Sequence, residues 1–262
     1  MIRINGDDVE LAVLDEGEGE AVLLIHGFPD SARLWRHQVP TLADAGFRVV
    51  APDLRGFGAS DKPADVAAYR MHHAVKDMVA VLDALGIERA HVVGHDWGAA
   101  VAWAMALLAP QRVNRLVVMS VGHPGVKRSL EQREKSWYML LFQFPEAEEL
   151  LRQNDWELLR EWIASHPDFN PDSFDLTAGL NWYRANLHPR NQLGPARVLP
   201  PAQADTLGLW STGDNYLIER GMTESAAHVS GRWRYERIED AGHWMMLDQP
   251  ERINALLLDF LA

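Results

Sequence analysis

The 262-residue chain contains no cysteine, which excludes disulfide bonds, thiolate nucleophiles and thiolate-ligated metal sites. Positive charge is also scarce, because 25 Lys and Arg stand against 37 Asp and Glu and give a formal net charge of −12. This balance argues against nucleic acids and anionic membranes as partners. The chain has no apolar run of membrane-spanning length, and its first residues lack the pattern of a signal peptide. We therefore expect a soluble, cytoplasmic protein.

The rest of the composition is that of a globular α/β protein. The length of 262 residues fits one large domain or a domain with one insertion. Apolar residues make up 47% of the chain, which is enough for a sizeable core. Residues 2–14 alternate around Asn5-Gly6 and predict an antiparallel hairpin. Apolar runs then alternate with helical patterns, which predicts a mostly parallel sheet flanked by helices. The expected strands are 21–25, 47–51, 91–93, 116–119, 206–211 and 232–238, and the expected helices are 35–45, 71–86, 99–109 and 250–261.

This alternation is interrupted between residues 122 and 198. The segment has helical patterns and several tryptophans but no convincing strand, and proline and glycine gather at its margins. We expect residues 122–198 to form a helical cap and residues 1–121 and 199–262 to form the core. A cap over the carboxyl edge of the sheet would shield a site there from bulk water.

The turn Gly94-His95-Asp96-Trp97-Gly98 lies between a predicted strand and an alanine-rich helix. Two glycines around a central polar residue form the pattern known as the nucleophile elbow, where close packing leaves no room for side chains beside the nucleophile. The central residue is usually serine, but here it is Asp96. A carboxylate can displace a leaving group from a saturated carbon and become an alkyl ester, which water must then hydrolyse. The competing interpretation is that Asp96 only caps the helix.

Two further titratable residues follow predicted strands and suit a catalytic triad. Asp214 follows the strand 206–211, and His243 follows the strand 232–238. The order nucleophile, acid, histidine is that of the α/β-hydrolase fold. The carboxyl ends of parallel strands meet at one edge, so we expect Asp96, Asp214 and His243 to converge there. Asp53 is the alternative acid, although its position in a glycine-rich loop favours a role as a turn residue.

Several motifs together resemble the α/β-hydrolase fold over essentially the whole chain. They are His26-Gly27-Phe28-Pro29, Arg55-Gly56-Phe57-Gly58-Ala59-Ser60, the elbow around Asp96, Gly213-Asp214 and Gly242-His243. Within that fold, His-Asp-Trp-Gly at the elbow is similar to the epoxide hydrolases and the haloalkane dehalogenases. Epoxide hydrolases of this type carry one cap tyrosine in Asn-Trp-Tyr-Arg, which matches Asn181-Trp182-Tyr183-Arg184. They carry another before Phe-Gln-x-Pro, and Tyr138 stands four residues ahead of Phe142-Gln143-Phe144-Pro145.

Tyrosine suits the opening of an epoxide, because the ring oxygen leaves as an alkoxide whose conjugate acid has a pKa of about 15.7. A phenol with a pKa of about 10 is protonated at neutral pH and can donate to that oxygen. The resemblance therefore implies an epoxide hydrolase in which Tyr138 and Tyr183 hold the epoxide and Asp96 attacks it. It further implies that His243, oriented by Asp214, activates the water.

The resemblance also implies an oxyanion hole formed by the backbone N–H groups of Phe28 and Trp97. It implies an apolar epoxide as the small-molecule substrate, with neither a cofactor nor a metal ion. His26 and His95 are expected to be structural, and Tyr216 is expected to be a packing or surface residue. The sequence leaves the oligomeric state open, a homodimer included.

Two other functions stay open at this point. A haloalkane dehalogenase would share the Asp96, His243 and Asp214 set and would use Trp97 as one halide donor. However, Phe28 stands where one dehalogenase subgroup has asparagine, and Ser120 stands where that subgroup has its acid. A non-catalytic ligand receptor on the same scaffold is the other alternative, but it would leave a complete set of charged residues unexplained.

Overall fold

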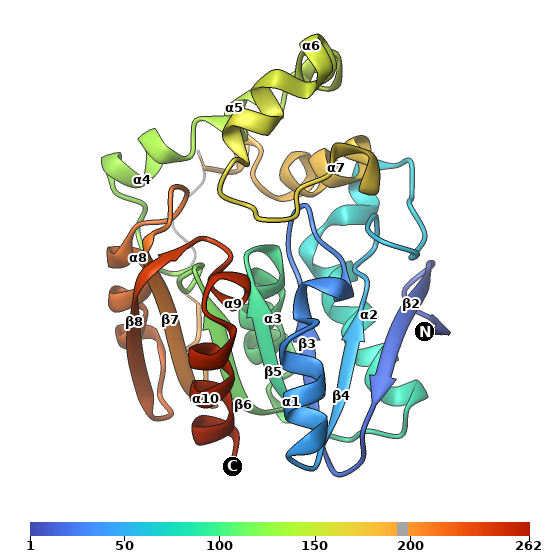
Figure 1. The fold of residues 1–262 in the computed structure, drawn as a ribbon, viewed down its shortest axis with the longest axis vertical. Helices are drawn as coiled ribbons and strands as arrows, with labels where there is room; N and C mark the ends of the chain where they lie inside the picture. The colour runs from blue at the N-terminus through green and yellow to red at the C-terminus, as the bar shows by residue number, and fades with distance from the viewer. Residues whose placement is uncertain (193–198) are drawn as a thin grey trace.

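An eight-stranded sheet runs through the centre of the computed structural model, which describes residues 1–192 and 199–262 (Figure 1). The strands are β1 (Ile2–Asn5), β2 (Glu10–Glu16), β3 (Glu20–Ile25), β4 (Phe47–Pro52), β5 (Ala90–His95), β6 (Val113–Met119), β7 (Asp205–Gly213) and β8 (Trp233–Gly242). Their order is β1-β2-β4-β3-β5-β6-β7-β8, with β1 and β2 antiparallel to their neighbours and all other pairs parallel. The predicted fold class, a mostly parallel sheet flanked by helices, is confirmed.

Helices cover both faces of the sheet, as the continuous apolar character of its central strands requires. They are α1 (Gln38–Asp44), α2 (Met71–Ala84), α3 (Trp97–Leu108), α8 (Glu219–Thr223), α9 (Met245–Asp248) and α10 (Pro250–Leu261). Helices α1 and α10 pack together on one face, and α2 and α3 pack together on the other (Figure 1). The side chains from Val22 to Ile25 in β3 are completely buried between these layers. No helix among the described residues is long and apolar enough to cross a bilayer.

The N-terminal hairpin forms as predicted, but its turn differs from the expected tight turn at Asn5-Gly6. Asn5 pairs with Glu10, so residues 6–9 form the loop, and the Gly6 N–H donates to the Val9 carbonyl at 2.7 Å. The reason is a contact with α2, where the Asp77 carboxylate accepts the Asp7 N–H at 2.8 Å. A Cβ on Gly6 would lie 2.4 Å from that same carboxylate. Gly6 is therefore needed for close approach to α2.

Four further helices follow β6 and lie above the carboxyl edge of the sheet (Figure 1). They are α4 (Leu130–Lys135), α5 (Tyr138–Leu141), α6 (Ala147–Trp162) and α7 (Leu176–Asn186). Helix α6 is interrupted at residues 153–156, where Asn154, Asp155 and Trp156 have positive φ. None of residues 122–192 forms a strand, and residues 193–198, the end of the expected cap, lie outside the described part.

The nucleophile elbow joins β5 to α3 through a single residue of unusual backbone geometry. Asp96 has φ 52° and ψ −121°, a conformation that L-residues rarely adopt. A Cβ on Gly94 would lie 2.2 Å from the Gly98 carbonyl oxygen, and a Cβ on Gly98 would lie 1.9 Å from the Ile25 carbonyl oxygen. The two glycines therefore allow β3, β5 and α3 to meet tightly enough to hold Asp96 at the sheet edge.

The elbow packing predicts a large cost for one added methyl group. Gly98→Ala should lower the free energy of unfolding by about 3 kcal/mol or more, because backbone atoms of β3 must move to admit the Cβ. Gly221→Ala is the matched control, since a Cβ there meets no atom within 4 Å. This control should be neutral or stabilising by about 0.5–1 kcal/mol. Equal urea denaturation midpoints for the two variants would show that the elbow tolerates a side chain.

Candidate active site

Three titratable side chains meet at the carboxyl edge of the sheet. His243 Nδ1 lies 2.9 Å from Asp214 Oδ2, and His243 Nε2 lies 3.7 Å from Asp96 Oδ2. These residues follow β8, β7 and β5, so the parallel sheet brings together positions far apart in the sequence. Asp214 and His243 are each only 3% exposed. The imidazole thus bridges a buried acid and the carboxylate at the elbow.

The acid is held by its own loop. Asp214 Oδ1 accepts the backbone N–H groups of Tyr216 at 2.8 Å and Leu217 at 3.0 Å, which leaves Oδ2 for His243. Burial alone would raise the pKa of Asp214, but His243 and these N–H donors outweigh it and lower the pKa. Asp53, the alternative acid, instead accepts the backbone N–H groups of Ala32 and Ala59 and braces two loops.

Asp96 presents one oxygen to a backbone donor and the other to the imidazole. The Phe28 N–H donates to Asp96 Oδ1 at 2.8 Å, so one of the two expected oxyanion-hole donors already points at this carboxyl group. Burial would raise the pKa of Asp96, but His243 and the Phe28 N–H overcome it and lower the pKa. The carboxylate is therefore ionised at neutral pH, as a nucleophile must be.

The charge state of His243 follows from its two neighbours. Burial alone would lower its pKa, but Asp214 and Asp96 together raise the pKa to about 10. His95, whose Nε2 contacts the His243 carbonyl oxygen at 2.9 Å, has its pKa lowered to about 4 by burial. His26 Nε2 accepts the Leu54 N–H at 2.9 Å and joins two loops. At neutral pH, His243 is thus a cation and His95 is neutral.

Both expected cap tyrosines face the same cavity as Asp96 and His243. Tyr138 on α5 and Tyr183 on α7 are each 3% exposed, and their ring centroids are 5.9 Å apart. Burial, followed by the Asp96 charge, raises the pKa of each phenol well above 10, so both stay protonated. The volume of this cavity is about 10 Å³. Its other walls are aromatic or aliphatic: Phe28, Trp162, Ile163, Tyr216 and Trp244.

Comparison with known proteins places the chain in a family. The model of the alpha/beta hydrolase fold matches residues 20–250. Epoxide hydrolase A of Mycobacterium tuberculosis is 33% identical over 318 aligned positions, with 100% of this chain and 96% of the relative covered. The chain belongs to the epoxide hydrolases of the α/β-hydrolase fold.

Solved epoxide hydrolases have the same architecture. The crystal structure of epoxide hydrolase A from Mycobacterium thermoresistibile is 30% identical, with a TM-score of 0.81 and coverage of 99% of this chain and 97% of that one. A mutant of an epoxide hydrolase from Bacillus megaterium, solved in complex with its product, a naphthyloxy-propane-1,2-diol, is 25% identical. Its TM-score is 0.89, and 99% of each chain is covered.

In this epoxide hydrolase, α7 is fastened to the core beside Tyr183. The Trp182 indole N–H donates to the Arg55 carbonyl oxygen at 3.0 Å. One turn later, the Asn186 amide donates to the Tyr69 carbonyl oxygen at 2.8 Å and accepts the Met71 N–H at 2.9 Å. These bonds between the cap and the core fix the height of Tyr183 above the sheet.

The two tyrosine motifs of the cap are also bonded to each other. Arg184 donates to the carbonyl oxygens of Phe142 at 3.0 Å and Phe144 at 3.1 Å. Gln143 donates in return to the Tyr183 carbonyl oxygen at 3.2 Å. The residues that follow Tyr138 and Tyr183 in their motifs therefore hold the two phenols at a set distance.

Gln132 on α4 is a positioning residue that sequence reasoning missed. Its amide nitrogen donates to the Tyr216 carbonyl oxygen at 2.8 Å, and its amide oxygen accepts the Ile218 N–H at 3.0 Å. These bonds brace the loop whose N–H groups hold Asp214. A glutamine in a short amphipathic helix carries no sequence signal for this role. Tyr216, expected to be a packing or surface residue, also lines the cavity, but its hydroxyl donates to the Trp162 carbonyl oxygen.

Two remaining features bear on what the site can bind. The buried Trp97 indole N–H lacks a hydrogen-bond partner of normal geometry among the described residues, and its ring packs edge-on against Tyr183. In the part of the chain that the structure covers, residues 1–192 and 199–262, no group of His, Asp and Glu side chains could hold a metal ion.

The raised pKa of His243 predicts how stability depends on pH. The folded pKa is about 10 and the ordinary value is 6.5, so between them the folded state holds a proton that the unfolded state has lost. The contribution of this proton to the free energy of unfolding is complete below pH 6.5 and is lost as the pH rises toward 10. The free energy of unfolding, measured by urea titration, should fall by up to about 1.4 kcal/mol per pH unit across this window.

His243→Gln provides the control and should flatten this slope. The pKa values of the other shifted histidines are all lowered, so their contributions to the free energy of unfolding change below pH 6.5. They are His26, His72, His91, His95 and His123. A slope that persists in His243→Gln would mean that another group carries the proton.

Proposed function

We propose that this epoxide hydrolase opens a small apolar epoxide to a 1,2-diol through a covalent alkyl ester on Asp96. Family membership supports the reaction class. The observation that carries the mechanism is one cavity lined by an ionised Asp96, two protonated phenols and a cationic His243. Epoxide opening is the reaction that needs a carboxylate nucleophile and a pair of proton donors together.

In the first step, an Asp96 carboxylate oxygen attacks a ring carbon and the bond from that carbon to the epoxide oxygen breaks. The electron pair passes to the epoxide oxygen, which takes a proton from Tyr138 or Tyr183. A phenol donates well here because the developing alkoxide is far more basic than a phenolate. The His243 imidazolium then returns a proton to the phenolate through water, which leaves a neutral imidazole and a hydroxyalkyl ester.

Esterification prepares His243 for the second step. The Asp96 charge is one of the causes that raise the pKa of His243, and it disappears when the ester forms. Neutral His243, oriented by Asp214, can then remove a proton from the attacking water. The carbonyl oxygen of the ester becomes an oxyanion that the Phe28 and Trp97 backbone N–H groups stabilise. When the adduct collapses, the diol oxygen takes the carboxylic acid proton, and Asp96 and the imidazolium are regenerated.

The proposed substrate is small because the cavity is small. Its volume of about 10 Å³ lies far below the 300–1,000 Å³ typical of sites for drug-sized ligands. Its aromatic walls favour an apolar epoxide, and residues 122–198 would act as the cap that excludes water. The cytoplasmic location stays a prediction from the composition.

The ester predicts a product that can be trapped. His243→Gln should open the epoxide but accumulate a protein adduct whose added mass equals that of the substrate, because the water is no longer activated. In the wild-type enzyme, single turnover in ¹⁸O water should place the label in the Asp96 carboxylate and not in the diol. Asp96→Asn is the control and should give neither adduct nor diol. Label that enters the diol directly would exclude the ester route.

A haloalkane dehalogenase is the second candidate. The Trp97 indole N–H, which has no hydrogen-bond partner of normal geometry among the described residues, favours it because such donors bind a halide leaving group. The two reactions differ in their need for a proton donor. Replacing Tyr138 and Tyr183 together by phenylalanine should lower kcat/KM for an epoxide by about 100-fold or more. Any displacement of bromide from a bromoalkane should persist, because halide needs no proton.

Single Tyr138→Phe and Tyr183→Phe variants serve as matched controls for this double variant. Each should show a smaller loss, since one phenol remains. If the double variant opens epoxides at the wild-type rate, the phenols do not donate the proton. If the wild-type enzyme releases bromide faster than it forms diol, the dehalogenase becomes the better assignment.

A further inference from the structure

A second cavity lies beside the start of the cap and contains a cation without an anionic partner. Arg128, which is half-buried there, forms no ion pair with any described carboxylate. Its guanidinium Nη1 lies 3.7 Å from the Met139 sulfur. A cation held away from bulk water is costly unless it is paired, so a cavity that contains one favours an anionic guest.

The residues around this cavity, here called the Arg128 cavity, are basic or neutral. Lys127, Arg128, Arg220 and His123 line it, and none of its described lining residues is acidic. Arg220 is paired with Glu224, so Lys127 and Arg128 are the charges without a local counterion among the described residues. This is unusual in a chain whose formal net charge is −12.

His123 is a second residue with an unmatched polar group beside this cavity. It is 2% exposed, and its Nδ1 accepts the Gly125 N–H at 3.0 Å. In the neutral ring the proton is therefore on Nε2, which is buried and has no hydrogen-bond partner among the described residues. Ser129, Gln132 and Ser136 supply further polar groups.

We propose that the Arg128 cavity binds a small oxyanion, a carboxylate or a phosphate, with Arg128 as its principal contact. Guanidinium matches the geometry of both groups and binds them through paired hydrogen bonds. Lys127 would add charge, so an oxyanion would pair with cations that have no counterion among the described residues.

This site is separate from the cavity that contains Asp96. Ser136 and Met139 line the Arg128 cavity, whereas the intervening Tyr138 lines the catalytic one. On the opposite wall, Leu217 faces the first and Tyr216 faces the second. The rings of Tyr138 and Tyr216, which line the catalytic cavity, pack edge-on with centroids 6.0 Å apart. The Asp96 carboxylate would repel an anion, so the two cavities select ligands of opposite character.

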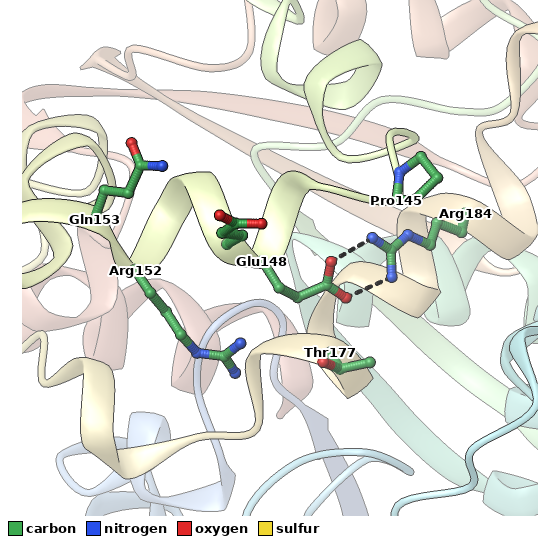
Figure 2. A pocket seen from close by; sticks show the side chains of 7 residues that line it. Pro145, Glu148, Arg152, Gln153, Thr177 and Arg184 are labelled. Carbon is green, nitrogen blue, oxygen red and sulfur yellow. Dashed lines mark hydrogen bonds and ion pairs between the residues drawn. The ribbon is translucent and has the colours of Figure 1, made fainter.

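The groove between α6 and α7 provides a contrast and a control. Figure 2 shows Arg152 beside Glu148, which makes a bidentate ion pair with Arg184 at 2.6 and 2.7 Å. Glu149 lines the same groove. Arg152 forms no ion pair with a described carboxylate, yet these acidic neighbours make its groove unsuited to anions. Arg152→Gln therefore removes the same charge from the same cap without touching the Arg128 cavity.

The first test measures binding to the intact protein by calorimetry, with inorganic phosphate and with butanoate at constant ionic strength set by chloride. We expect Kd values of about 1 mM, the scale of a few charge-assisted contacts. Arg128→Gln should weaken binding at least tenfold, while Arg152→Gln should leave it unchanged. If Arg128→Gln does not fold, Arg128→Lys should still bind, more weakly than wild type. In addition, phosphate should raise the Tm of the wild-type protein above the value in chloride alone.

The second test asks whether the oxyanion is a free ion or part of the substrate, and this arm alone rests on the proposed function. It compares kcat/KM for an epoxy carboxylic acid and for its methyl ester. If the acid group of the substrate occupies the cavity, Arg128→Gln should lower the ratio of acid to ester at least tenfold. Binding of phosphate or butanoate without a change in this ratio identifies a free ion.

If neither the free oxyanions nor the acid-to-ester ratio depends on Arg128 beyond the Arg152→Gln control, the proposal is wrong. Failure of the proposed function would look different. In that case neither the acid nor the ester would be turned over, whereas phosphate and butanoate would still bind in the calorimeter. The two ideas can therefore fail separately.

Discussion

The imidazole of His243 lies between two carboxylates, and the electrostatic balance among these three groups underlies the rest of the site. With both acids ionised, the ring holds a proton up to about pH 10. A catalytic base must be neutral, so a histidine in this setting becomes a base only after one of its neighbours loses its charge. Ester formation at Asp96 would do this, and it would do so only when substrate has reacted. Under the proposed mechanism, the resting enzyme would therefore not activate water before the substrate has reacted.

This balance depends on parts of the chain that are distant in the sequence. Asp96 is set by the packing of β3 and β5 around glycines, and Asp214 is set by two backbone N–H groups of its own loop. That loop is in turn braced by Gln132 from the cap. The cap therefore supplies phenols to the cavity and also stabilises the acid beneath them. Its contribution to the site is structural as well as chemical.

The sequence predicted what depends on local patterns and on chain order. Apolar runs located the parallel strands, and the elbow glycines located Asp96 at the sheet edge. Asp214 and His243 were expected to meet Asp96 because each follows a strand, and the three side chains do lie together. The sequence did not predict the features that depend on contacts between residues far apart in the chain. The hairpin loop is longer than expected because Asp77 on α2 binds it, and Gln132 and Tyr216 reach the site only through packing of the cap on the core.

The hydrogen bonds that join the two tyrosine motifs have a consequence for substrates of different size. Arg184 and Gln143 hold α5 and α7 together, whereas Trp182 and Asn186 join α7 to the core. A shift of the cap would have to break the bonds of α7 to the core, and it would then carry both phenols together. If the phenols hold the epoxide oxygen as proposed, a bulkier guest that caused this shift would widen the gap between the two phenols and Asp96 and leave their contact with its oxygen unchanged. Selectivity among epoxides would then depend on the distance between the Asp96 carboxylate and the ring carbon that it attacks.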